Sequence, residues 1–210
     1  IAVAVWTNEE GTRFQPVMMG SGVYAGAFTV EHCLAQRDAE GISVGEALAA
    51  IGAAGTDAAP AFDAYFEGHI EQGPVLENES KTIGVVEGAL GQRWFDVVLE
   101  GQDAHAGPTP IELRRDALLA AAQLTVAVRE VATSHPHYAR GTVGRLVVAP
   151  NSRNVIPGRV EMSIDLRCAD AATLDAMTDA VKGAAAKISA DSGVSISLEQ
   201  TVYFAPCAFD

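Results

Sequence analysis

The stretch Val160-Glu-Met-Ser-Ile-Asp-Leu-Arg167 alternates strictly between apolar and polar side chains. Successive side chains of a β-strand point to opposite faces of its sheet, so this alternation predicts a strand in a sheet that is covered on one face only. The apolar face of such a sheet must be buried against a second layer of structure. The sequence on either side of residues 160–167 must therefore supply that layer.

Residues 88–201 contain the elements that this sheet needs. Asp170 is placed to cap a helix at its start, and Gly193 is placed to end the same helix. The order is β-α-β-β-α-β, which predicts a ferredoxin-like α+β domain with two helices on one face of a four-stranded antiparallel sheet. From hydrophobic periodicity, the other strands are expected at residues 94–100, 142–149 and 194–198, and the helices at residues 112–131 and 174–188.

Residues 1–87 predict part of a separate α/β domain. The run Ile1-Ala-Val-Ala-Val-Trp6 is apolar throughout, which is typical of a strand buried on both faces of a parallel sheet. A second strand is expected at residues 64–70, and residues 202–210 predict a return into this domain. Because such strands need neighbours, we expect the natural protein to extend beyond both ends of the chain. Helices are expected at residues 24–37 and 44–51, with Gly41 and Gly52 as stops.

Composition excludes several classes of function. The chain has 210 residues and a net charge of -13, which argues against nucleic acid or an anionic membrane as the main partner. No apolar run is long enough to span a bilayer. The cysteines at positions 33, 168 and 207 lie too far apart for a disulfide framework or a metal knuckle, so we expect a reducing, cytoplasmic environment.

Two acidic residues, Glu9 and Glu10, follow the first predicted strand, where open α/β sheets place their ligands. Of two carboxylates at such a place, one can hold a metal ion while the other transfers a proton. A solvated turn would have the same sequence. His69 follows the second predicted strand and, with Glu10, would offer the nitrogen and oxygen donors that zinc, manganese, cobalt or nickel accept, although a histidine there can also be a packing residue.

Two further polar clusters lie in the predicted ferredoxin-like domain. His105 lies in a loop rich in glycine and proline before the first helix, which is also consistent with a simple helix-entry turn. Arg167 lies on the polar side of its strand and could be solvated, or it could bind a substrate carboxylate with Asn154 as a neutral donor.

Taken together, these clusters resemble one family. Asn8-Glu-Glu-Gly11, His69-Ile-Glu-Gln-Gly-Pro74, Ala104-His-Ala-Gly107 and Asn154-Val-Ile-Pro157 with Asp165-Leu-Arg167 occur in the order found in M20-type metal-dependent amidohydrolases. The similarity is greatest to the N-carbamoyl-L-amino-acid hydrolases, β-ureidopropionases and allantoate amidohydrolases. The resemblance implies an α/β metallopeptidase-like catalytic domain, residues 1–87 and 202–210, with an inserted lid domain, residues 88–201, through which the protein forms a homodimer.

The resemblance also implies roles for individual residues. Glu9 would be the general base for the attacking water, and Glu10 and His69 would be ligands in a centre of two divalent metal ions. His105 would stabilise the oxyanion, in some members in the partner's active site. Substrate amide or carboxylate groups would be bound by Gln72, Asn154 and Arg167.

The remaining ligand motifs of the family do not occur in residues 1–210. These are a His-x-Asp, a bridging Asp before the Glu-Glu pair and a histidine near the C-terminus. We therefore expect the 210 residues alone to bind metal weakly and to be inactive. Two alternatives stay open for the whole protein, namely an M20 aminoacylase or peptidase that cleaves N-acyl amides and a dimeric relative without catalysis. The intact Glu9 argues against the second alternative.

Overall fold

The computed structural model describes residues 1–55, 60–135 and 138–209, and within them the chain forms two compact units, Ile1–Ile70 and Glu71–Asp210. Each unit has its own hydrophobic core. None of the helices in the described residues is long and apolar enough to cross a membrane. The predicted domain boundary at residue 87 stays a prediction.

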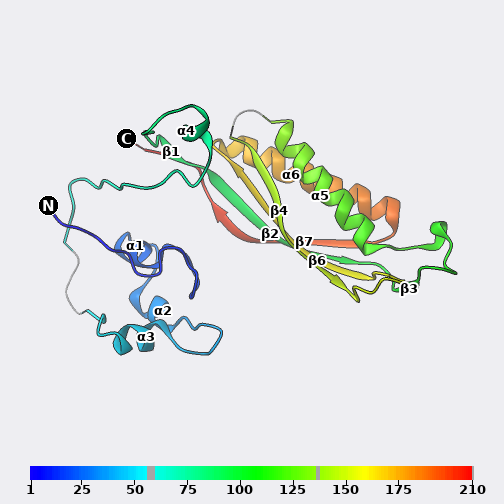
Figure 1. Ribbon diagram of the computed structural model, residues 1–210, viewed down its shortest axis with the longest axis horizontal. Helices are drawn as coiled ribbons and strands as arrows, with labels where there is room; N and C mark the ends of the chain where they lie inside the picture. Colours follow the sequence, from blue (N-terminus) through cyan, green and yellow to red (C-terminus); the bar gives the residue numbers. More distant parts are fainter. Residues whose placement is uncertain (56–59, 136–137, 210) are drawn as a thin grey trace. The chain divides into compact units, whose positions relative to one another are not determined.

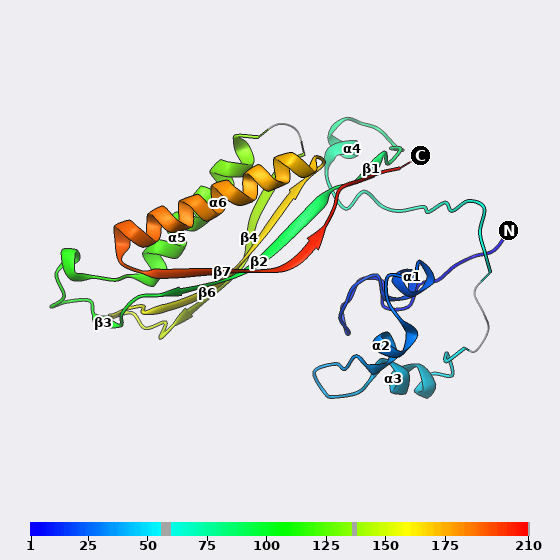
Figure 2. The ribbon, with the colours of Figure 1, turned by 180° about the vertical axis from the view of Figure 1, so that it is seen from behind.

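The second unit has the expected ferredoxin-like topology (Figure 1). Four antiparallel strands pair in the spatial order β4-β6-β2-β7, and both long helices pack on one face of this sheet (Figure 2). Its elements are β2 Gly91–Glu100, α5 Ala117–Thr133, β4 Arg140–Ala149, β6 Arg159–Cys168, α6 Ala171–Ser192 and β7 Ser195–Phe204.

The burial of side chains along β6 alternates, as expected for a sheet that is covered on one face only. Val160, Met162, Ile164 and Leu166 are at most 1% exposed, whereas the intervening polar residues lie on the open face. Burial of a side chain of this size contributes about 1.5–3 kcal/mol relative to exposure, so this strand is the centre of the core. The alternation of residues 160–167 therefore predicted the correct face of the sheet.

The ends of α6 are fixed by the residues that the sequence indicated. The Asp170 carboxylate accepts a hydrogen bond from the Thr173 amide at 2.6 Å, and hydrogen bonds from Thr173 lower the pKa of Asp170. At the other end Gly193 has a φ of 67°, and its N–H bonds to the carbonyl of Ser189. The expected helix at residues 112–131 begins later, at Ala117, because Asp116 caps it and Ile111–Leu113 form a separate 3-10 turn, η1.

Short elements complete the second unit. The pair β1, Gly88–Ala89, and β8, Cys207–Ala208, brings the two ends of the sheet domain side by side. The pair β3, Ala104–His105, and β5, Val155–Ile156, lies at the other end of the domain (Figure 1). A one-turn helix, α4 Val75–Asn78, precedes β1.

The first unit differs from its prediction. Residues 1–6 and 64–70 form no strand, and Ile1, Val3 and Val5 are exposed, so the two expected buried strands are wrong for this structure. A buried strand requires neighbours for its backbone hydrogen bonds, and none of the described strands pairs with either segment. The helices are α1 Met19–Tyr24, α2 Val30–Ala35 and α3 Val44–Ala50.

Only one of the two helices expected in the first unit occurs as predicted. The helix expected at residues 24–37 is shorter and begins at Val30, because Gly26 has a φ of 76° and Thr29 caps α2 by accepting a hydrogen bond from the His32 amide. The prediction for residues 44–51 is confirmed by α3, where Ser43 and Glu46 form a reciprocal capping box.

Candidate active site

The loop that carries Glu9 and Glu10 is held by its backbone and by its neighbours. Asn8 has a φ of 50° and donates hydrogen bonds from its side-chain amide to the carbonyls of Phe14 and Pro16, at 2.9 and 3.1 Å. Gly11 has a φ of 65°, and a Cβ there would lie 2.4 Å from Cγ1 of Val17. The Glu9 and Glu10 side chains are exposed, and the contacts that hold the shape of the loop come from other side chains and from the backbone.

An ion pair fixes the far side of this loop. The Arg13 guanidinium binds the Asp38 carboxylate at 2.8–2.9 Å, and the Asp38 side chain is only 3% exposed. Burial alone would raise the pKa of Asp38, but hydrogen bonds from the Ile42 amide and from Arg13 outweigh it and lower the pKa. The turn after α2 is therefore joined to the loop through a carboxylate that stays ionised at neutral pH.

Aromatic side chains bring residues 62–67 next to this loop. The indole N–H of Trp6 donates to the Tyr65 hydroxyl at 3.0 Å, and that hydroxyl donates to Glu67 at 2.6 Å. The hydrogen bond to Glu67 raises the pKa of Tyr65 against the opposing effect of the Trp6 N–H, and the nearby charge of Glu9 adds to the increase. Glu9 and the segment leading to His69 are thus neighbours in the first unit.

The metal-ligand prediction for Glu10 and His69 rests on the chemistry of their side chains. Glu10 and His69 supply the carboxylate oxygen and imidazole nitrogen that a borderline divalent ion accepts, so their chemistry fits. Residues 1–55, 60–135 and 138–209 nevertheless contain no group of three or more His, Cys, Asp or Glu side chains that could hold an ion together. Assignment of both residues as ligands stays a prediction.

Gln72 and the adjacent Glu71 begin the second unit. The Glu71 carboxylate accepts hydrogen bonds from the amides of Val75 and Leu76, both at 2.9 Å, and so it caps α4. Gln72 is exposed and has a φ of 53°, an uncommon backbone conformation for a residue with a side chain. The turn leaves the Gln72 amide accessible, and its role in substrate binding stays a prediction.

His105 and Asn154 are brought together at the end of the second unit. Antiparallel pairing of β3 with β5 places His105 opposite Val155, and the Ala106 amide donates to the Asn154 carbonyl at 2.9 Å. Both side chains are exposed. We call this region, residues 101–110 and 150–158, the tip.

Further bonds join the two loops of the tip. The Gly158 amide donates to the Asp103 carboxylate at 2.6 Å, and the Gly101 amide donates to the Gly158 carbonyl at 2.8 Å. The Ser152 hydroxyl donates to the side-chain oxygen of Asn154 at 3.0 Å. The tip is therefore a fixed scaffold for one imidazole and one amide.

Arg167 lies at the opposite end of the sheet from the tip. It pairs with Gln92, close to the start of β2, which follows β1 in the chain. Its guanidinium contacts Asp165 of the same strand through Nε and Nη2 at 2.8–3.1 Å, and its side chain is 44% exposed. An exposed pair of this kind contributes little stability, so the guanidinium can also bind a second carboxylate.

The distance between these groups limits what one chain can do. Arg159 is the first residue of β6 and Arg167 is the last but one, and at about 3.3 Å per residue they lie about 26 Å apart. The tip lies beyond Arg159, because Gly158 bonds into it. Asn154 and Arg167 of one chain therefore cannot bind the two ends of one small molecule.

One residue that contacts the tip was not singled out by the sequence. Arg114 donates from Nη2 to the Ala106 carbonyl at 2.8 Å and from Nε to the Thr109 carbonyl at 3.0 Å. Its only signal in the sequence is its place just after a loop of glycine and proline, and arginine in such a place is usually solvated. The tertiary contacts alone distinguish it from the exposed Arg115.

Comparison with known proteins identifies the family of the chain. Residues 88–192 match the M20 peptidase dimerisation domain. The chain is 45% identical to an N-carbamoyl-L-amino-acid amidohydrolase of Rhizobium meliloti over all of this chain and 51% of that protein. It is 37% identical to an allantoate amidohydrolase of Bacillus subtilis over 76% of this chain and 40% of that protein.

A solved structure has the same fold. The chain matches a hydantoinase/carbamoylase family amidase from Burkholderia ambifaria with a TM-score of 0.89 and 45% identity, over 98% of this chain and 51% of that one. The chain thus spans about half the length of the relatives that it matches. Because half of its residues match this dimerisation domain and its relatives are amidohydrolases, the chain belongs to the M20 amidohydrolase family.

Proposed function

We propose that the whole protein hydrolyses the carbamoyl or ureido C–N bond of an N-carbamoyl amino acid, N-carbamoyl-β-alanine or allantoate, with release of ammonia and carbon dioxide. The observation that carries this proposal is the tip, where the pairing of β3 with β5 brings His105 and Asn154 onto adjacent backbone segments, both with exposed side chains. Imidazole and carboxamide groups can form hydrogen bonds with the N–H and C=O groups of a ureido group. The names of the relatives support the same substrates.

In this proposal the first unit supplies the proton chemistry. Glu9 takes a proton from the attacking water and delivers it to the leaving nitrogen, which requires an exposed carboxylate on a fixed loop. Glu10 and His69 would hold a divalent ion, with further ligands needed for a centre of two such ions. When bound, zinc, manganese, cobalt or nickel would supply Lewis-acid polarisation and a lower pKa for water.

The second unit supplies binding of the substrate and stabilisation of charge. The His105 imidazole donates a hydrogen bond to the oxygen that becomes negatively charged, and Asn154 and Gln72 bind amide groups of the substrate. Arg167 binds the substrate carboxylate, because a guanidinium can contact both oxygens of a carboxylate. Since Arg167 and the tip are about 26 Å apart in one chain, the tip acts in the active site of a partner subunit.

A homodimer is therefore part of the proposal, and two features support an interface at α5 and β4. Strand β4 is an edge strand, and its Leu146 and Val147 are more than 40% exposed. Unpaired edges of this kind are templates for pairing with another chain. The 17-residue helix α5 has only two charged residues, Arg129 and Glu130, whereas α6 has five along its 22 residues.

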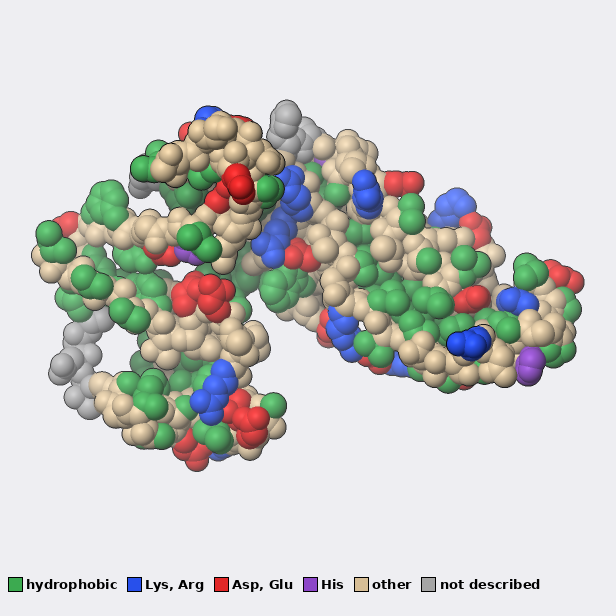
Figure 3. Space-filling view, viewed as in Figure 1, with side chains coloured by type: hydrophobic (Ala, Val, Ile, Leu, Met, Phe, Trp, Pro, Cys, Tyr) green, Lys and Arg blue, Asp and Glu red, His purple; other side chains and the backbone are tan. Residues whose placement is uncertain are grey.

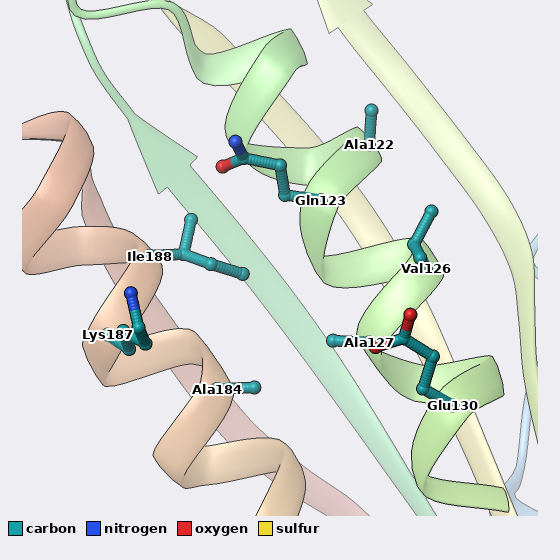
Figure 4. A pocket seen from close by; sticks show the side chains of 8 residues that line it. All are labelled: Ala122, Gln123, Val126, Ala127, Glu130, Ala184, Lys187 and Ile188. Carbon is teal, nitrogen blue, oxygen red and sulfur yellow. The ribbon is translucent and has the colours of Figure 1, made fainter.

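The surface near this edge is hollowed and apolar. Apolar side chains gather along α5 in the space-filling view (Figure 3). A shallow hollow between the helices is lined from α5 by residues such as Val126 and Ala127 and from α6 by Ala184 and Ile188 (Figure 4). A second hollow lies between α5 and β4. Side chains of a second copy could fill both hollows, and the family match to a dimerisation domain supports that occupant.

We propose that the protein is cytoplasmic. Cys33 and Cys168 are buried and unpaired, and Cys207 is an exposed thiol. Unpaired thiols of this kind are typical of a reducing compartment.

A comparison of substrates tests the proposed reaction. We expect the whole protein to hydrolyse N-carbamoyl amino acids with a higher kcat/KM than the matching N-acetyl amino acids. A site that hydrogen-bonds the terminal –NH₂ discriminates by about 10⁴–10⁵-fold against an analogue without it. Release of ammonia and of free amino acid from matched pairs would be measured. Faster cleavage of the acetyl compounds would favour an M20 aminoacylase or peptidase instead.

Arg167→Ala tests the proposed recognition of a carboxylate. In the whole protein we expect this change to raise KM for a carboxylate substrate by about 10- to 100-fold, because a charge-assisted pair contributes about 1.5–3 kcal/mol. KM for the corresponding carboxamide should change little. Arg145→Ala is the matched control, because Arg145 lies on β4 of the same sheet and forms an ion pair with Glu161. Equal effects of Arg167→Ala on both substrates would contradict the assigned role.

A further inference from the structure

The imidazole of His105 has a specific hydrogen-bond partner within its own turn. The Gly107 amide donates to Nδ1 of His105 at 3.0 Å. A nitrogen that accepts a hydrogen bond carries no proton of its own, so the ring proton of the neutral imidazole lies on Nε2. This arrangement selects the tautomer whose N–H points away from the turn.

Position 107 allows this contact because it is glycine. A Cβ at Gly107 would lie 3.3 Å from Cε1 and 3.4 Å from Nδ1 of His105. Contacts of that length are tighter than most side chains tolerate, so a larger residue would push the amide away from the ring. The close approach of backbone and imidazole therefore depends on the path of residues 105–109.

Arg114 holds that path from outside the turn. Its Nη2 donates to the Ala106 carbonyl, and its Nε donates to the Thr109 carbonyl. The two acceptors flank Gly107, and the Thr109 hydroxyl adds a bond to the His105 carbonyl at 2.6 Å. The planar guanidinium fixes two points of the backbone at a set spacing, which a single ammonium group cannot do as well.

We propose that Arg114 is a positioning residue that holds the Gly107 amide against Nδ1 of His105 and so keeps this imidazole in its Nε2–H tautomer. Arg114 is half-buried and directs two of its nitrogens at backbone carbonyls, so it acts through the turn and not on a substrate. The consequence for catalysis rests on the function proposed above. An Nε2–H fixed in direction is the donor that an oxyanion needs, because the donor is oriented before the reaction.

The test begins with the 210-residue chain itself, without any measurement of activity. Long-range ¹H–¹⁵N correlation spectra of the ¹⁵N-labelled chain at neutral pH distinguish the two tautomers of each histidine, with His105→Gln used for assignment. We expect His105 to be predominantly Nε2–H. In Arg114→Met we expect a mixture of tautomers, and in Arg114→Lys a smaller change. A wild-type chain with His105 in the Nδ1–H form would overturn the proposal.

The neighbouring arginine provides the matched control. Arg115 is exposed, and its side chain lies near Gly193 instead of the turn. Arg115→Met should leave the His105 signals unchanged, and thermal unfolding should show that α5 and the sheet remain intact in both variants. If Arg114→Met leaves His105 in a single Nε2–H tautomer, the proposal is wrong.

Kinetics of the whole protein separate this inference from the proposed function. We expect Arg114→Met to lower kcat by about 10- to 100-fold with little change in KM, since misplacement of a catalytic group by 1 Å can cost about 100-fold. Arg114→Lys should recover part of the loss. Full activity of Arg114→Met despite mixed tautomers would contradict the positioning role. Full activity of His105→Ala would contradict the proposed function and leave the tautomer result intact.

Discussion

An equimolar mixture of His105→Ala and Arg167→Ala chains of the whole protein is expected to recover about a quarter of the wild-type activity, although each variant alone is much slower. Loss of a donor to the oxyanion lowers kcat by about 100- to 1,000-fold, and loss of the guanidinium lowers kcat/KM for carboxylate substrates. The recovery arises because the tip and Arg167 that share one active site come from different chains. A mixed dimer then has one site in which both groups are intact.

Random pairing sets the size of the expected recovery. About half of the dimers formed from equal amounts of the two chains are mixed, and each has one working site out of two. Activity would be measured after co-refolding or co-expression of differently tagged chains, with the fraction of mixed dimers determined by native mass spectrometry. No recovery in a confirmed mixed dimer would contradict a shared active site.

The two tip residues provide a matched control for this experiment. His105 of β3 and Asn154, which precedes β5, both lie in the tip, so both substitutions damage the part of each shared site that the tip supplies. Mixing His105→Ala with Asn154→Ala leaves both sites of a mixed dimer damaged. We therefore expect no recovery from this pair, and recovery would show that the two residues serve different sites.

Glu9→Gln in the whole protein is expected to lower kcat by about 100- to 10,000-fold, which is the usual contribution of a general base. The amide has nearly the same shape but cannot accept the proton from the attacking water. The loop should keep its shape, because Asn8 and Gly11 hold it and Glu9 contributes only its carbonyl, which accepts from the Met18 amide at 2.7 Å. The metal content, measured by elemental analysis, should remain that of the wild type.

Glu10→Gln is the matched control at the adjacent position. If Glu10 is a ligand, its amide should bind the ion less well, and this variant should lose metal content together with activity. We therefore expect the Glu9→Gln variant to retain its metal ions and the Glu10→Gln variant to lose them. A fully active Glu9→Gln protein would place the base elsewhere, and inactivity of the wild-type protein with its metals bound would favour a relative that has lost catalysis.

Local sequence determined most of the second unit. The alternation of residues 160–167 predicted β6 and its buried face, and Asp170 and Gly193 predicted both ends of α6. These predictions depend on contacts within a few residues or on a period of two, which a single sequence displays directly. The start of α5 was missed because Asp116, and not the apolar periodicity, decides where that helix begins.

The first unit shows where such patterns stop being informative. Residues 1–6 are apolar at every position, yet Ile1 and Val3 are exposed in this structure and form no strand. An apolar run indicates that a segment can be buried, but it does not identify the strands with which the segment would pair. Pairing is a tertiary property, because the hydrogen bonds of a strand are made with other segments.

The sequence by itself determined which chemical groups the chain carries and in what order, including Glu9, Glu10, His69, His105, Asn154 and Arg167. Only the tertiary structure decided which of them can act together. His105 and Asn154 are far apart in the sequence but meet where β3 pairs with β5. Asn154 and Arg167 are close in the sequence but are separated by the whole of β6. The physical reason is that an extended strand moves sequence neighbours apart by about 3.3 Å per residue, while antiparallel pairing brings distant segments into contact.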